Sequence, residues 1–105
     1  MENLNKKIDM NEGRMAENQT KPVEVLIADD LIVNIYFIKH NLENLGYKVD
    51  FATNGDMLVE RAKITLPDVI LLDAGIPVIA WNDAAAKLKE NETTAAIPII
   101  LMVDN

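Results

Sequence analysis

The chain has no cysteine and few glycines or prolines, four of each in 105 residues. The absence of cysteine excludes disulfide bonds, thiolate metal sites and cysteine nucleophiles, and it agrees with a reducing compartment. No apolar run reaches the length that spans a membrane. The polar N-terminal residues have no apolar segment of the kind that a secretory signal requires. We therefore expect a cytoplasmic protein that has no membrane contact.

Basic residues are also scarce, and their distribution divides the chain in two. The formal net charge is −7, and residues 23–105 carry all of it, because residues 1–22 hold four acidic and four basic side chains. The polar residues 1–22 are expected to form a disordered tail, and residues 23–105 have the length of one small domain. An acidic domain argues against nucleic-acid binding, which requires basic side chains. It permits binding of a divalent cation.

From Glu24 onward, segments typical of strands alternate with segments typical of helices. Short apolar runs rich in β-branched residues predict strands, whereas apolar residues spaced by three and four predict helices. The predicted strands are 24–28, 47–52, 69–72 and 98–103, and the predicted helices are about 35–45, 56–65 and 81–89. Ile35, Ile38, Leu42 and Leu45 form the apolar side of the first helix, Gly46 ends it, and Asp56 caps the second. This order predicts an α/β fold with three layers, in which helices cover both faces of a parallel sheet.

Three acidic residues follow two of the predicted strands. Asp29 and Asp30 come after the first strand, and Asp73 comes after the third. An aspartate at such a position often does no more than cap the next helix, but ligands of parallel sheets bind at the carboxyl ends of the strands. Carboxylates that converge there repel one another unless a cation is bound, and Mg²⁺ prefers such oxygen ligands. A carboxylate beside a metal can attack phosphorus, which makes Asp73 a candidate nucleophile.

These motifs together resemble the receiver domains of two-component response regulators. The similarity extends without gaps from residue 24 to residue 103. The residues that carry it are Val25–Asp30, Leu45–Tyr47, Asn54–Gly55, Leu66–Asp73, Pro77 and Ile97–Ile100. The segment from Asp29 to Asn34, together with Leu66-Pro-Asp68, is most similar to receivers that precede diguanylate cyclase domains. The resemblance implies a flavodoxin-like receiver fold. Because the chain ends at Asn105, it also implies a truncated receiver, without the last strand and helices.

The resemblance also implies a role for each acidic residue. Asp73 would be the phosphoacceptor, and Asp30 would bind Mg²⁺ directly with assistance from Asp29. The backbone carbonyl of Gly75 would be a further metal ligand. The phosphoryl group would come from a phosphohistidine on a histidine kinase or a histidine phosphotransfer protein. A receiver of this kind is a phosphoacceptor in a phosphorelay and not an enzyme in its own right.

The sequence departs from the family at three places. Val103 stands where the family has a Ser or Thr whose hydroxyl contacts the phosphoryl group, and no Lys matches the one that follows the family's fifth strand. Lys87 and Lys89 come too early and lie on a predicted surface helix. The loop Pro77-Val-Ile-Ala-Trp81 has apolar residues where the family has turn glycines, so we expect it to fold differently or to pack on another part of the molecule.

Two functions therefore stay open. The acidic residues favour a phosphoacceptor, whereas Val103 and the unmatched Lys favour a degenerate pseudo-receiver that acts as a phosphorylation-independent interaction or dimerisation module. A related Mg²⁺-dependent phosphohydrolase is discounted, because it needs a second acid at position 75, where this chain has Gly. A fourth strand that is apolar and lies at the edge of the sheet invites pairing with another chain. We hypothesise dimerisation, domain swapping or docking to a partner.

Overall fold

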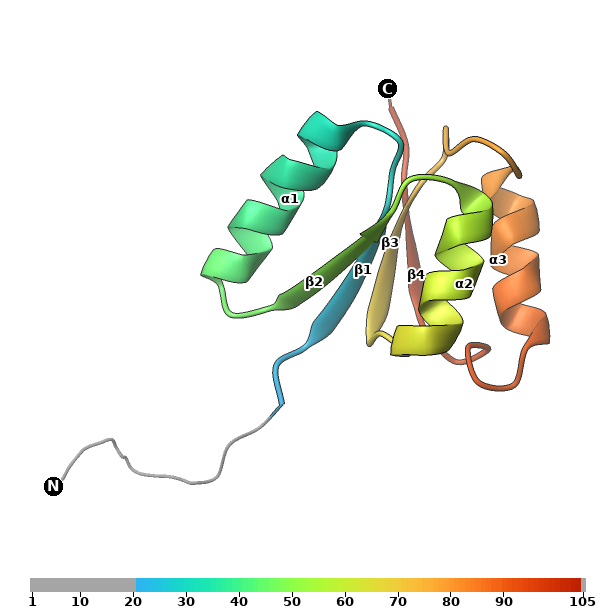
Figure 1. Cartoon of the computed structure of the whole chain (residues 1–105). Coiled ribbons are helices and arrows are strands. Elements are labelled where there is room, and N and C mark those ends of the chain that lie inside the picture. The colour runs from blue at the N-terminus through green and yellow to red at the C-terminus, as the bar shows by residue number, and fades with distance from the viewer. Residues whose placement is uncertain (1–20, 105) are drawn as a thin grey trace, which may run out of the picture.

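The computed structural model describes residues 21–104, which form a parallel sheet flanked by helices. In chain order the elements are β1 (Glu24–Ala28), α1 (Ile32–Asn44), β2 (Lys48–Ala52), α2 (Gly55–Thr65), β3 (Val69–Asp73), α3 (Trp81–Glu90) and β4 (Ile99–Met102). The strand order is β2-β1-β3-β4, and all neighbouring strands are parallel. The predicted α/β fold is confirmed, with α1 on one face of the sheet and α2 and α3 on the other (Figure 1). The predicted tail lies outside the described residues, apart from Lys21 and Pro22.

The central strands β1 and β3 are held by apolar side chains on both faces. In β1, Leu26 and Ala28 point to one side and Ile27 to the other, and all three are fully buried. Strands that are covered on both faces are continuous apolar runs, which is the pattern that predicted them. Residues 25–28 of β1 pair in register with residues 69–72 of β3, so both strands end at the same edge of the sheet.

Helix α1 has the predicted apolar side over most of its length. Ile35 is buried, and Ile38 and Leu42 pack beside it against the sheet. Leu45, which the spacing placed on the same side, is 75% exposed. The reason is that the helix ends at Asn44 and the chain turns away at Gly46, whose φ of +96° favours glycine. The predicted helix end at Gly46 is confirmed.

The start of α2 corrects one prediction, because Asp56 is not the cap. The helix begins at Gly55, and Asn54 caps it by accepting a hydrogen bond from the Met57 backbone N–H at 2.8 Å. Asp56 lies in the first turn, where a negative charge is favoured by the helix dipole. Both residue types are good caps, so composition alone did not distinguish them.

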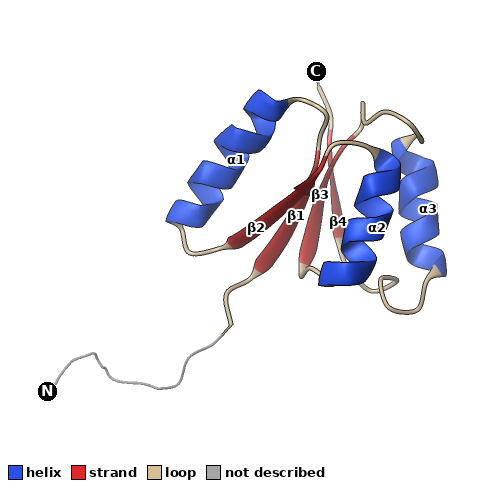
Figure 2. Ribbon diagram, in the orientation of Figure 1, coloured by secondary structure: helices blue, strands red, loops and turns tan. Residues whose placement is uncertain are grey.

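Figure 2 shows α1 on one face of the sheet and α2 and α3 on the other. The apolar clusters on these two faces differ in size. The larger cluster lies under α2 and α3 and contains the buried residues Leu26, Ala28, Ala52, Leu58, Val59, Ala62, Ile70, Leu72, Ile76, Ala84, Leu88 and Ile97. Under α1 the buried residues are Val25, Ile27 and Ile35, with partly buried neighbours around them. The face under α2 and α3 therefore contains most of the core.

Strand β4 lies at the edge of the sheet that residues 21–104 form. Its residues Ile100 and Leu101 are exposed, and Ile99 and Met102 are partly buried. The expectation of an apolar edge strand is confirmed. None of the described helices is long and apolar enough to cross a membrane.

Candidate functional site

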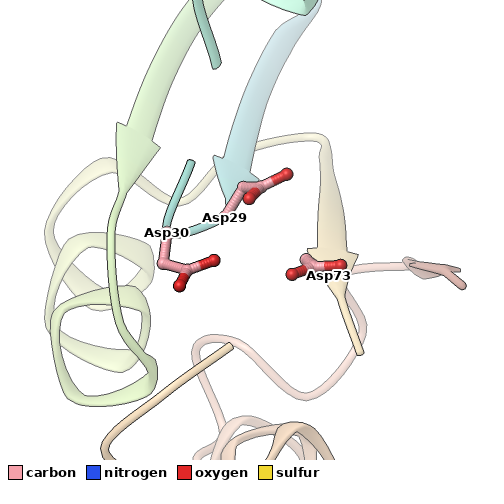
Figure 3. Close-up of side chains that lie close together, drawn as sticks. All are labelled: Asp29, Asp30 and Asp73. Atoms are coloured by element: carbon pink, nitrogen blue, oxygen red, sulfur yellow. The ribbon is translucent and has the colours of Figure 1, made fainter. Parts of the chain in front are cut away.

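The carboxyl ends of β1 and β3 bring three carboxylates together, as the sequence predicted. Asp29 and Asp30 directly follow β1, and Asp73 is the last residue of β3. One carboxylate oxygen from each residue lies within 4.8 Å of the others. Figure 3 shows the three side chains around one shared space. The parallel register of β1 and β3 creates this cluster, because it ends both strands at the same level.

Asp29 is the buried member of the cluster and is held by hydrogen bonds. Its side chain is 3% exposed. One carboxylate oxygen accepts from the Leu31 backbone N–H at 2.9 Å, and the other accepts from Asn34 Nδ2 at 3.2 Å. Asn34 belongs to the motif that begins at Asp29, but the motif alone does not predict this hydrogen bond. Its position on the first turn of α1 lets it orient the buried carboxylate.

The surroundings of Asp73 shift the pKa of its carboxyl group. Burial raises the pKa of Asp73 above its ordinary value of 3.8, and the negative charge of Asp29 raises it further. The Gly75 backbone N–H lowers this pKa by hydrogen bonding to the ionised carboxylate, while Asp30 and Asp104 raise it. Every charged group that contributes to the shift is acidic. The site therefore favours a positive ligand that would neutralise this repulsion.

The loop after β3 holds Gly75 against the side chain of Asp73. Besides the Gly75 N–H that bonds to the carboxylate, the Ile76 N–H donates to the Asp73 carbonyl at 3.2 Å. A Cβ at position 75 would lie 3.4 Å from Asp73 Oδ2, an ordinary contact. Gly75 is exposed, and the role of its carbonyl as a metal ligand stays a prediction.

The rest of this loop packs on α2, which was one of the two outcomes expected for it. The Gly55 N–H donates to the Pro77 carbonyl at 3.1 Å. Ile79 fits against Gly55 so closely that a Cβ there would overlap its side chain. Between these contacts Val78 has a φ of +78°, which a β-branched residue rarely adopts. The loss of glycine from this loop is visible in the sequence, but the strain at Val78 was not predicted.

The other two departures from the family motif are Val103 and the unmatched Lys. Val103 directly follows β4 beside the end of β3, where the Ala74 N–H donates to the Met102 carbonyl at 2.9 Å. Its aliphatic side chain is 63% exposed. Lys89 binds the carbonyls of Ala95 and Ile97, which precede β4, so it lies at the opposite end of the sheet from Asp73. Lys89 therefore cannot replace the family's Lys.

The three carboxylates fit a divalent cation in number and in chemistry. Their oxygens are close enough to share one ion, and carboxylate and carbonyl oxygens are the ligands that Mg²⁺ and Ca²⁺ prefer. Burial raises the pKa of Asp73, and the negative charges of Asp29 and Asp30 raise it further, so repulsion between the carboxylates is part of the shift. A bound cation would remove that repulsion.

Comparison with known proteins matches the chain to one protein family. Residues 25–105 match the family model of the response regulator receiver domain. The response regulator PleD of Caulobacter vibrioides is 33% identical over 78 residues, which are 74% of this chain and 17% of PleD. The chemotaxis response regulator CheY4 of Vibrio cholerae superposes with a TM-score of 0.74 at 26% identity, over 77% of this chain and 68% of that chain.

A third similar structure was described with a bound metal ion. It is the receiver domain of a sensor histidine kinase from Pseudomonas aeruginosa, described with a magnesium ion coordinated in its active-site cleft. It has a TM-score of 0.73 and 31% identity, over 77% of this chain and 66% of that chain. The chain thus spans a small part of PleD and about two thirds of the solved receivers. From its family match, its fold and its acidic edge, the chain belongs to the response regulator receiver domains, the phosphoacceptor modules that interact with histidine kinases in two-component systems.

Proposed function

We propose that this chain accepts a phosphoryl group on Asp73 from a phosphohistidine of a histidine kinase or phosphotransfer protein, with Mg²⁺ at the acidic cluster. The observation that carries the proposal is the convergence of Asp29, Asp30 and Asp73 within 4.8 Å at one edge of the sheet. Asp73 is partly exposed, so an incoming phosphoryl group can reach it. The family match supports the same role.

The transfer requires one bond to form and one to break. A carboxylate oxygen of Asp73 attacks phosphorus and forms an O–P bond, while the P–N bond to the donor imidazole breaks. The electron pair of that bond stays on the imidazole nitrogen, so the product is an acyl phosphate on Asp73. The attacking carboxylate must be ionised, and the Gly75 N–H supports that form by hydrogen bonding to it.

Each neighbour of Asp73 has a separate task in this proposal. Asp30 is exposed and would bind Mg²⁺ directly, while Asp29 assists from its buried position, where Asn34 orients it. The carbonyl of Gly75 would complete the protein ligands. When bound, Mg²⁺ neutralises charge on the phosphoryl oxygens and on the carboxylates.

A degenerate pseudo-receiver is the second candidate, and Val103 favours it. A hydroxyl at this position would donate a hydrogen bond to the phosphoryl group, which a valine cannot do. In addition, all charges that affect Asp73 are acidic, so none of them stabilises the transferred group. Such a chain would use the same surface for protein contacts without phosphorylation.

The two candidates are separated by incubating the protein with Mg²⁺ and phosphoramidate, whose P–N bond resembles that of phosphohistidine, and measuring intact mass. A phosphoacceptor gains the mass of one phosphoryl group, and Asp73→Asn does not. Asp83→Asn, which changes an aspartate in the first turn of α3, is the matched control and should still gain it. No gain in a wild-type protein that circular dichroism shows to be folded would reject phosphorylation in favour of the pseudo-receiver.

A further inference from the structure

The loop between β3 and α3 holds one residue in a strained conformation. Val78 has a φ of +78°, a region that β-branched residues rarely adopt and that costs about 1–3 kcal/mol. The Val78 side chain is 69% exposed, so burial of the valine does not offset this cost. Contacts made by other residues of the loop must therefore keep Val78 in this conformation.

Both neighbours of Val78 are anchored to one residue, Gly55. On one side, the Pro77 carbonyl accepts a hydrogen bond from the Gly55 N–H at 3.1 Å. On the other side, Ile79 packs against Gly55, which is buried. Gly55 is the first residue of α2, so the loop meets the start of this helix at the end of the sheet that holds the acidic cluster (Figure 1). We call the contacts of Pro77 and Ile79 with Gly55 the latch.

The latch requires a residue without a side chain at position 55. A Cβ there would lie 2.9 Å from the backbone carbonyl oxygen of Ile79 and would overlap the Ile79 side chain. The side chain of Ile79 can rotate away, but its carbonyl moves only when the loop moves. Gly55 has no positive φ, so the close approach of the loop, and not the backbone conformation, requires glycine here.

The same loop holds Gly75 against the acidic cluster. The Gly75 N–H bonds to the Asp73 carboxylate, and the Gly75 carbonyl is the proposed backbone ligand of the metal. Gly75 is exposed and has no side chain, so its position depends on the anchored residues that follow it. These are Ile76, which is buried in the core under α2 and α3, and Pro77, which belongs to the latch.

We propose that the latch positions Gly75 for a cation bound at Asp73, and that Gly55 is the positioning residue that makes the latch possible. This role rests on the proposed function, because it requires Mg²⁺ at the acidic cluster. While the latch is closed, Val78 stays at positive φ and Gly75 stays against Asp73. When the latch opens, Val78 relaxes to negative φ, the loop moves, and the cation loses its backbone ligand. Cation binding and latch closure therefore stabilise each other by the same free energy.

Titration of the whole chain with Mg²⁺, followed by the NMR shifts of its backbone amides, tests the positioning role. Gly55→Ala should weaken Mg²⁺ binding by about fivefold or more. Gly46→Ala is the matched control, because Gly46 has a φ of +96° and precedes β2 at the amino end of the sheet. It should lower the stability of the fold and leave the Mg²⁺ affinity unchanged. Circular dichroism checks that both variants are folded.

The strain at Val78 distinguishes positioning from a general loss of stability. Glycine adopts a positive φ without strain, so Val78→Gly lets the loop keep its conformation when the latch is broken. In the Val78→Gly background, Gly55→Ala should therefore weaken Mg²⁺ binding less than it does in the wild-type background. The same loss of affinity in both backgrounds would overturn the proposal.

Hydrogen exchange of the Gly55 N–H measures the latch directly in the wild-type chain. Exchange requires the hydrogen bond to the Pro77 carbonyl to open, so saturating Mg²⁺ should slow it. The control is the Lys48 N–H, which donates to the Val23 carbonyl at 2.9 Å at the amino end of β2. Mg²⁺ should slow exchange at Gly55 more than at Lys48. Equal slowing at both would mean that the cation stabilises the whole fold without closing the latch, which would overturn the proposal.

The Mg²⁺ titrations separate failure of the latch from failure of the proposed function. A wild-type chain whose amide shifts do not respond to Mg²⁺ would contradict both, because no cation would then be bound for Gly75 to contact. A wild-type chain that binds Mg²⁺ with the same affinity as Gly55→Ala would contradict the latch alone and leave the proposed function intact.

Discussion

The two sides of strand β3 differ in burial and in what they contribute. On the side under α2 and α3, Ile70 and Leu72 are fully buried. On the side of α1, Val69, Leu71 and Asp73 are partly exposed. The covered side gives the apolar burial that stabilises the fold. The open side holds Asp73, the proposed phosphoacceptor, so the acidic cluster lies on the side of the sheet where fewer residues are buried.

The largest effect expected from this difference is on stability. Leu72→Ala removes a fully buried side chain and should lower the free energy of unfolding by about 3 kcal/mol. Leu71→Ala, on the open side, should lower it by about 1 kcal/mol, because the lost side chain was already partly in water. Urea unfolding, measured at a concentration where both variants are monomeric, gives the two values. Equal losses would mean that the two sides contribute alike.

A substitution at Asp73 should change the free energy of unfolding by a smaller amount, and it should raise it rather than lower it. Because its pKa is raised in the fold, the folded state holds the proton more tightly than the unfolded state does. This stabilisation is complete below the ordinary value of 3.8 and is lost as the pH rises through the higher folded value. At neutral pH Asp73 is therefore destabilising, and Asp73→Asn should raise the free energy of unfolding by about 1 kcal/mol.

Thermal unfolding in EDTA at neutral pH and again below pH 3.8 measures this difference. The advantage of Asp73→Asn should be present at neutral pH and should disappear in acid. Added Mg²⁺ should stabilise the wild-type protein more than the variant, because the cation neutralises the repulsion. Asp83→Asn, which removes a charge in the first turn of α3, serves as the control. A wild type that is more stable than Asp73→Asn at neutral pH in EDTA would contradict the electrostatic argument.

The smallest change in the free energy of unfolding is expected from a substitution in the loop between β3 and α3. Val78 has a positive φ, and glycine adopts this conformation without strain. Val78→Gly should therefore raise the free energy of unfolding by about 0.5–1 kcal/mol, after subtraction of the entropy that glycine adds to the unfolded chain. Val23→Gly changes an exposed valine that has no positive φ and should give no gain. A loss of stability at Val78 would indicate that the loop is not strained.

Much of the fold follows from local sequence patterns. The runs that became β1 and β3 are apolar on both sides and end at aspartate, so their position and their common edge were predictable. The sides of α1 were harder to predict, because Ile32 to Ile38 is apolar almost all round. Periodicity indicated Ile35 as buried but could not show that Val33 and Phe37 would remain exposed, since that depends on which strands the helix covers.

The three acidic residues of the site were predictable from the sequence, but the residues and contacts around them were less so. Asp29, Asp30 and Asp73 were identified because parallel strands bring their carboxyl ends together. The hydrogen bond from Asn34 to Asp29 depends on the direction in which α1 leaves the sheet. The strain at Val78 depends on the contact of Ile79 with Gly55, which are far apart in sequence. Asp56 and Asn54 are two residues apart, and the choice of cap depends on where the first turn begins.

The most direct test of the central claim is to locate the phosphoryl group after incubation with phosphoramidate and Mg²⁺. Borohydride reduction converts an aspartyl phosphate to a stable alcohol, which tandem mass spectrometry of proteolytic peptides can assign to one residue. We predict modification at Asp73, abolished by EDTA and reduced in Asp30→Asn. Modification at another residue, such as His40, or no modification in the folded protein would contradict the assignment of Asp73 as the phosphoacceptor.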